Sequence, residues 1–462
     1  MDYQVVWRGP VHDMSGYGTA SRGCALALDR QGVDRQAGPG GDGLVVMGPR
    51  RRSMETSRRA CARMNGEKGS IAMTDYQVIW RGPVLSSSTG YGNASREYAA
   101  ALHRQGVDVK VETHSRGIPA ATHDGRRPGL IRKLIGKPYA SNKPKLLIYH
   151  SPDWTIDMGR EKRRFDKIIL MTAWETAHIP RNKLPVLNRY DAICVPSSQN
   201  VKAMVSSGVT VPVYLAPHGA DTSRYRPDNR KISLRGMEDR FVFVSVFDFL
   251  HRKNPELLLR AYWEEFTAAD RTALVIKTYS PRHKKSGEWI RRTVLDFKKK
   301  LGISGNTAPL VLLTHVLEDE QMKGLYTLGN AFVLPTRGEA VGLPYMEALA
   351  SGVPVIATCW GGQMDFLHGG NSFLVRCRLQ NPAIGIRSRE ALSPFYRSLF
   401  LNQDQLWAEP DLQDLKRQMR MAYEKPELSR EKGVQGREDM MLHTWDRGGI
   451  ALKHAIERLR RP

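Results

Sequence analysis

Glu339 and Glu347 are the residues of this sequence whose type and spacing most clearly predict chemistry. Between them, Gly342 can bring backbone close to a ligand because glycine has no Cβ atom. Pro344 suits the first position of a helix, where free amides and the positive end of the helix dipole attract an anion. We expect Glu339 to accept hydrogen bonds from sugar hydroxyls and Glu347 to accept them from a ribose. The amides near Gly342 and Leu343 would then hold a diphosphate, and a nucleotide-sugar presents these three groups together.

The same residues have a purely structural explanation, because a helix often follows Gly-Leu-Pro and an exposed glutamate usually meets water. The surrounding sequence favours a ligand. The run from Glu339 resembles the signature Glu-Gly-Phe-Gly-Leu-Pro-x-x-Glu-Ala of the retaining GT-B glycosyltransferases of family 4 (glycosyl transferases group 1). Ala340 and Val341 replace the usual Gly-Phe. The runs 331–336, 351–357 and 361–365 also fit this family, although Asp365 ends the last run where glutamate is more common.

A second part of the resemblance lies at 244–256, which is similar to the strand and loop that open the donor domain of these enzymes. The family places an arginine and a lysine there on the donor diphosphate, where cations stabilise charge on the leaving group. Lys253 matches the lysine. Asp248 stands where the arginine is usual, so Arg252 is the candidate in its place. The alternative for both cations is a solvated loop.

Candidate residues of the other half of the cleft lie between 76 and 176. The loop with Gly90, Tyr91 and Gly92 follows a predicted strand and opens a helix, so its amides could face a phosphate. His150 ends another predicted strand, and the resemblance implies that it lines the reaction centre. The loop 172–176, with Trp174, could line the acceptor side. The alternatives are an ordinary Gly-Tyr-Gly turn, a structural histidine and a core tryptophan.

Alternating strands and helices must position these side chains. Short, nearly continuous apolar strands between helices predict parallel sheets covered on both faces. The pattern predicts an α/β fold with two Rossmann-like doubly wound domains facing a cleft, and ligands at the carboxyl ends of the strands. The resemblance adds the GT-B arrangement. The predicted strands are 76–82, 109–113, 145–150, 167–172, 190–195, 211–215, 241–247, 272–278, 309–313, 331–334 and 354–358.

An internal repeat precedes this alternation: residues 2–11, 15–22 and 30–34 return with few changes at 75–84, 89–96 and 104–108. Each copy predicts a strand, a glycine loop and an amphipathic helix, but only the second continues into another strand. We interpret 1–34 as a partial duplicate and 35–72 as a flexible linker; the alternatives are an added edge strand or a swap between the copies. The pattern predicts an N-terminal domain at 73–228, a C-terminal domain at 229–437 and a helix at 438–462. The resemblance implies that the first domain is on the acceptor side, that the second binds the donor and that the last helix crosses back to the first domain.

The net charge and its distribution limit the classes of binding partner. The net charge of +23 is compatible with phosphate-bearing ligands, anionic lipid or nucleic acid, but it is spread along the chain without a nucleic-acid-binding motif. We therefore expect no nucleic-acid partner. The basic stretch 126–137, with Leu130, Ile131, Leu134 and Ile135, could instead meet an anionic membrane; the alternative is a solvated helix face.

The sequence also allows predictions about cofactors and location. It has no Asp-x-Asp triplet at a strand end, so we expect neither a metal nor another cofactor. The five cysteines show no paired spacing, which fits a reducing cytoplasm; the alternative is a peripheral position on the inner face of the cell membrane.

Together these features predict a retaining glycosyltransferase that moves a sugar from a nucleotide-diphosphate sugar to a saccharide or lipid-linked acceptor. The expected setting is the synthesis of a cell-surface polysaccharide or glycolipid. The alternative is a catalytically inactive GT-B-like protein that binds sugar nucleotides or nucleic acid.

Overall fold

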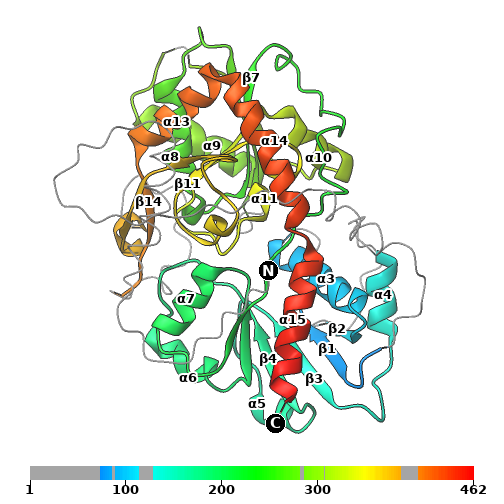
Figure 1. Ribbon diagram of the computed structural model, residues 1–462. Helices are drawn as coiled ribbons and strands as arrows, with labels where there is room; N and C mark the ends of the chain where they lie inside the picture. Colours follow the sequence, from blue (N-terminus) through cyan, green and yellow to red (C-terminus); the bar gives the residue numbers. More distant parts are fainter. Residues whose placement is uncertain are drawn as a thin grey trace, which may run out of the picture.

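The computed structural model describes residues 73–85, 89–113, 128–280, 286–305, 307–386 and 404–461. Two six-stranded sheets form separate domains, one above the other in Figure 1, and helices cover both faces of each sheet. All the pairings within these two sheets are parallel. The predicted fold of two doubly wound Rossmann-like domains is therefore confirmed.

The first sheet has the strand order β2-β1-β3-β4-β5-β6. The order changes direction between β1 and β3, and ligands of such sheets bind beyond the carboxyl ends of the strands at that point. Apart from the edge strand β6, which is only partly buried, the strands are buried along most of their length, and this explains their apolar sequences. They are β1 (Gln77–Arg81), β2 (Asp108–Glu112), β3 (Lys145–His150), β4 (Lys167–Met171), β5 (Ala192–Val195) and β6 (Val213–Leu215).

The second sheet has the order β12-β11-β10-β7-β8-β9, so its direction changes between β7 and β10. Its last strand, β12, was not predicted, because Ser-Phe-Leu-Val is short and follows directly on a Gly-Gly-Asn turn. A separate two-stranded antiparallel sheet, β13 with β14, lies beside this sheet. The strands are β7 (Phe241–Asp248), β8 (Thr272–Tyr279), β9 (Leu310–Leu313), β10 (Ala331–Leu334), β11 (Val355–Thr358), β12 (Ser372–Val375), β13 (Cys377–Gln380) and β14 (Trp407–Pro410).

Helices connect and cover these strands. Side chains of α8, α10, α11 and α13 join the strands of the second sheet in one large core. The first sheet instead separates two smaller cores, one on each face. The helices of the first domain are α3 (Gly90–Arg104), α4 (Pro128–Gly136), α5 (Met158–Lys162), α6 (Leu184–Leu187) and α7 (Ser198–Ser206), and those of the second are α8 (Pro255–Glu265), α9 (Ser286–Lys300), α10 (Asp319–Leu328), α11 (Leu343–Ala350), α12 (Pro382–Ile386) and α13 (Leu412–Glu424). Short 3-10 turns also occur as η1 (Arg181–Lys183), η2 (His251–Lys253) and η3 (Gly362–Asp365).

The chain ends in two consecutive helices rather than in one helix from 438. Helix α14 (Pro426–Leu442) packs on α11 of the second domain, and α15 (Trp445–Arg460) packs on α3 of the first, as Figure 1 shows. Trp445 is buried in the core of the first domain, and Gly449 lies so close to Ala101 that an added Cβ would be 2.8 Å from the Cβ of that alanine. Helix α15, which follows α14 of the second domain and packs on the first, therefore holds the two domains together.

The second copy of the repeat supplies β1 and α3, whereas the first copy at 1–34 and the predicted linker at 35–72 lie outside the described residues. Strand β1 is hydrogen-bonded to β2 on one side and to β3 on the other. We therefore expect that deleting residues 1–72 leaves a folded protein with unchanged Tm and turnover. Thermal unfolding and activity of the truncated chain test this expectation, and loss of the folded state would show that the first copy is part of the sheet.

The basic stretch differs from the prediction in one respect. Residues 126 and 127 lie outside the described part, but α4 follows, and its Ile131 and Leu134 are 4% and 1% exposed in the first core. Leu130 and Ile135 pack against the same core. These aliphatic groups are therefore not free for a bilayer, and the basic side chains Arg132 and Lys133 remain on the exposed face. Among the described helices, none is long and apolar enough to span a membrane.

Candidate donor site between the two domains

The switch point of the second sheet brings two loops together. Arg252 and Lys253 lie in η2, directly after β7, and Glu339 lies in the loop after β10. Arg337 N donates a hydrogen bond of 2.8 Å to the carbonyl oxygen of Arg252, so the loops are joined through their backbones. Arg252 takes a place near the carboxylate even though Asp248 replaces the arginine that the resemblance implied.

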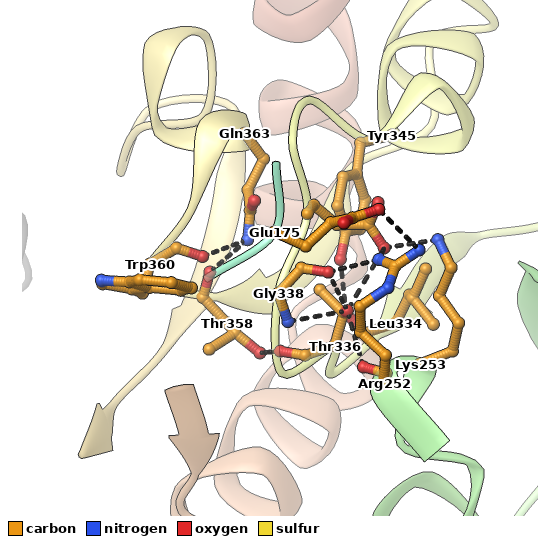
Figure 2. A network of polar contacts seen from close by, with 11 residues as sticks. Glu175, Arg252, Lys253, Leu334, Thr336, Gly338, Tyr345, Thr358, Trp360 and Gln363 are labelled. Atoms are coloured by element: carbon orange, nitrogen blue, oxygen red, sulfur yellow. Dashed lines mark hydrogen bonds and ion pairs between the residues drawn. The ribbon is translucent and has the colours of Figure 1, made fainter. Parts of the chain in front are cut away.

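Glu339 is the centre of this cluster and is 6% exposed. Its Oε1 lies 2.5 Å from Nζ of Lys253 and 3.2 Å from Nη1 of Arg252, and the hydroxyl of Thr336 donates to it at 3.2 Å. Burial by itself would raise the pKa of Glu339, but the charges of Lys253 and Arg252 outweigh it and lower the pKa. An ionised carboxylate is therefore fixed beside two cations. Figure 2 shows the side chains of these two cations, Arg252 and Lys253, next to each other.

Gly342 gives the chain its turn into α11. Its φ of +89° is in the left-handed region, and an added Cβ would lie 2.4 Å from the ring of Tyr345, so another residue would be strained there. The helix begins at Leu343, which places Pro344 second rather than first. The hydroxyl of Tyr345 donates to the carbonyl oxygen of Leu334 at 2.7 Å and holds the helix start against β10.

Glu347 lies one turn into α11 and is half-buried. The hydroxyl of Tyr326, which is fully buried on α10, donates to its Oε2 at 2.7 Å. A small pocket between the domains is lined by Glu347 and Leu343 on one side and by Asn93 and Glu97 of α3 on the other. Leu343 and Glu347, which were both predicted to bind the donor, therefore face the first domain.

Sequence reasoning missed a buried ion network behind this loop. Arg337 is 5% exposed, and its guanidinium lies 2.8 Å from Oε1 of Glu256 on α8 and 2.7 Å from Oε2 of Glu409 on β14. His251 is 2.7 Å from the same carboxylate of Glu256. The network fixes the backbone immediately before Glu339. Its partners are far apart in the sequence, which gave no sign that they meet.

The first domain brings His150 and Tyr91 together at its own switch point, after β3 and β1. Their rings stack with centroids 5.1 Å apart, and the Tyr91 hydroxyl accepts a hydrogen bond of 3.1 Å from the amide of Ala173. Burial lowers the pKa of His150 to about 3, with a further contribution from His218, so the imidazole is neutral at physiological pH.

The glycine loop has a simpler structure than a phosphate cradle. Thr89 caps α3, and its hydroxyl accepts a hydrogen bond of 3.0 Å from the amide of Gly92. Gly90 is exposed, and a Cβ there would meet nothing within 4 Å. One amide of the first turn is thus already bonded within the chain.

The loop 172–176 after β4 contacts the donor site, but through Glu175 rather than Trp174. Trp174 is 7% exposed and packs on Trp154 in the core, so the structural alternative holds for it. The next residue, Glu175, reaches across the interface, with its Oε1 3.4 Å from Nη2 of Arg252. Asp365 makes a second contact between the domains, because it accepts a hydrogen bond of 2.8 Å from the amide of Ser198 on α7.

The described side chains include no group of three or more His, Cys, Asp or Glu residues placed to hold a metal ion. The charged groups at the switch point are instead Lys253, Arg252 and Glu339. This set can bind an anion and, beside it, a group with several hydroxyls.

Residues 238–383, which contain all of these donor-site residues, match the family model of glycosyl transferases group 1. The chain is 27% identical over 198 residues to D-inositol 3-phosphate glycosyltransferase of Corynebacterium jeikeium, covering 41% of this chain and 46% of that protein. It is 30% identical over 167 residues to a GDP-mannose-dependent alpha-(1-6)-phosphatidylinositol monomannoside mannosyltransferase of Mycolicibacterium smegmatis, covering 34% of this chain and 41% of that protein. The chain thus spans less than half the length of these curated relatives.

The likeness to solved structures extends over both domains. Sucrose-phosphate synthase of Thermosynechococcus elongatus superposes with a TM-score of 0.57 at 16% identity, over 83% of this chain and 99% of that one. The predicted GT-B fold and the predicted resemblance to the group 1 enzymes are both confirmed.

Proposed function

We propose, for a chain with a GT-B fold and a relation to the group 1 glycosyltransferases, that the cleft transfers a sugar from a nucleotide-diphosphate sugar to an acceptor hydroxyl. The observation that carries the proposal is the buried Glu339 held at 2.5 Å by Lys253 and beside the turn at Gly342. A nucleotide-sugar offers a diphosphate to the cation and the helix start, and hydroxyls to the carboxylate.

Donor binding follows from these positions. Lys253 and Arg252 would bind the diphosphate together with the amides near Gly342 and Leu343, while Glu347 would accept hydrogen bonds from the ribose. When the sugar–phosphate bond breaks, the electron pair stays on the phosphate oxygen, and the two cations stabilise that charge. We also propose that this stabilisation of the leaving group requires no metal ion.

Retention at the anomeric carbon is also proposed. The acceptor hydroxyl would attack the same face from which the diphosphate leaves, and the leaving phosphate oxygen would take its proton. His150 would line this centre as a neutral group, consistent with a pKa lowered to about 3. It could hydrogen-bond a sugar hydroxyl but not supply a proton at neutral pH.

The acceptor class is inferred from the relatives. Their names specify D-inositol 3-phosphate and phosphatidylinositol monomannoside, one a soluble polyol phosphate and the other a glycolipid. We propose a saccharide or lipid-linked acceptor in glycolipid or cell-surface polysaccharide synthesis. The protein would act in the cytoplasm, and the exposed basic side chains of α4 would attract it to an anionic inner membrane surface.

A panel of UDP- and GDP-sugars tests the proposal. Thermal shift identifies the donor that binds, and release of nucleoside diphosphate in the presence of inositol, saccharide and glycolipid acceptors measures turnover. NMR of the product then gives the anomeric configuration. Binding without release of nucleotide would favour the inactive sugar-nucleotide-binding protein, and inversion would contradict same-face attack.

Replacing Glu347 with alanine should weaken donor binding by about 1–3 kcal/mol, because a charged hydrogen bond to the ribose is lost and Tyr326 loses its acceptor. Calorimetric titration with the nucleoside diphosphate measures the change. Glu320, whose side chain is 86% exposed on α10, provides the matched control Glu320→Ala with unchanged Kd. Equal affinity of Glu347→Ala and wild type would remove Glu347 from the site.

A further inference from the structure

Glu175 reaches the donor site from the first domain, although the mechanism above gives it no part. Its Oε1 is 3.4 Å from Nη2 of Arg252, while Nη1 of the same guanidinium is 3.2 Å from Oε1 of Glu339. Figure 2 shows the side chain of Glu175 directed at Arg252. One cation of the candidate phosphate site is therefore shared between carboxylates of two domains.

The backbone at Glu175 is held firmly on both sides. The amide and the carbonyl oxygen of Trp174 are hydrogen-bonded to the side chain of Asn200 at 2.8 and 2.7 Å. The hydroxyl of Thr176 donates to Oε1 of Gln405 at 2.5 Å. An added Cβ at Gly338 would lie 2.2 Å from the carbonyl oxygen of Glu175, so the donor loop touches this backbone directly. The carboxylate thus extends from a fixed base.

The charged side chains around Arg252 sum to zero net charge in the ligand-free protein. Arg252 and Lys253 carry two positive charges, and Glu339 and Glu175 carry two negative ones. A diphosphate adds negative charge beside the same cations. Glu339 is 7% exposed in its side chain and is held by Lys253 and Thr336 as well, whereas the side chain of Glu175 is 30% exposed. Of the two carboxylates, Glu175 is the one that an incoming phosphate can displace at lower cost.

We propose that Glu175 is a positioning residue that holds Arg252 in the ligand-free protein and gives it up when the donor diphosphate binds. This inference rests on the proposed function. Glu175 acts through Arg252 and competes with the phosphate for the guanidinium. Donor binding is thereby coupled to a contact between the two domains.

The test is the affinity of UDP and GDP for Glu175→Gln, which keeps the size of the side chain and removes its charge. We expect the Kd to fall about threefold to tenfold, as the loss of a partly screened competing charge implies. If Glu175 had only a structural role, the substitution would weaken nucleotide binding or leave the Kd unchanged. Glu238→Gln is the matched control, because Glu238 is exposed near the amino end of β7, opposite the turn with Arg252, and its removal should leave the Kd unchanged.

Repeating the substitution in an Arg252→Met background separates the competition from other effects. The tightening should disappear there, since the competition is for the guanidinium. Equal or weaker binding by Glu175→Gln, or the same tightening without Arg252, would overturn the inference. If neither nucleotide binds the wild-type protein in the cleft, the proposed function itself fails, and this outcome is distinct from the other two.

Discussion

Replacing Glu339 with glutamine should lower kcat by about 100-fold or more, while the donor KM changes much less. The carboxylate is 6% exposed and neutralises both Lys253 and Arg252, and an amide cannot do so. The cations would then lose the geometry in which they meet the departing phosphate, and the sugar hydroxyls would lose a charged acceptor. Loss of one such preorganised interaction commonly costs a factor of about 100 to 1,000 in turnover. Steady-state kinetics with the donor found in the panel measure both constants.

A loss of turnover caused by the missing carboxylate must be distinguished from one caused by misfolding of the variant. Circular dichroism and thermal unfolding of Glu339→Gln show whether the protein is folded, and nucleoside diphosphate affinity shows whether the site still binds. A folded variant with a small change in Kd and a large loss of kcat is the expected pattern. Wild-type kinetics in this variant would remove Glu339 from the reaction centre.

Replacing Arg337 with methionine should destabilise the protein by about 3–5 kcal/mol, because it leaves the buried Glu256 and the partly buried Glu409 without their cation. Urea unfolding measures the change in the free energy of unfolding. Arg271→Met is the control: its side chain is 72% exposed in a pair with Asp239, and we expect a change within about 0.5 kcal/mol. A similarly small effect at Arg337 would contradict the assigned network.

The same network gives a pH dependence with a definite sign. Burial alone would raise the pKa of Glu256, but Arg337 and His251 lower it below the usual 4.5. A carboxyl group whose pKa is lower in the folded state stabilises the fold fully above the unfolded value and less as pH falls through the folded value. Stability should therefore fall on acidification below pH 4.5, and part of this dependence should be absent in Arg337→Met.

The fold was largely predictable because the chain repeats a local pattern. The strands of both sheets are short apolar runs separated by helices, and each run marks a strand whatever its distant partners are. Strand β12 escaped because four residues after a glycine turn give little periodicity. For the aliphatic side chains of α4, a bilayer and a solvated helix face stayed open as alternatives for a related reason: an amphipathic pattern shows that one face is covered but not by what.

The candidate site was predictable where its residues lie close together in the sequence or, as for Lys253, where they match the pattern of the group 1 enzymes. Glu339, Gly342 and Glu347 belong to one loop and one helix, so their spacing defines their arrangement. Glu175 and Arg337 act through contacts with residues more than 70 positions away, such as Arg252 and Glu409. Only the folded backbone brings these charges together, and arginine or glutamate in a loop does not show whether it is buried.

A crystal structure of the protein with UDP or GDP, whichever binds, tests the central claim most directly. The account predicts phosphate oxygens within hydrogen-bonding distance of Nζ of Lys253 and of the amides near Gly342 and Leu343. It also predicts the ribose hydroxyls at the carboxylate of Glu347. A nucleotide bound outside the cleft, or one whose phosphates do not contact Lys253, would contradict the assignment of this cleft as a donor site.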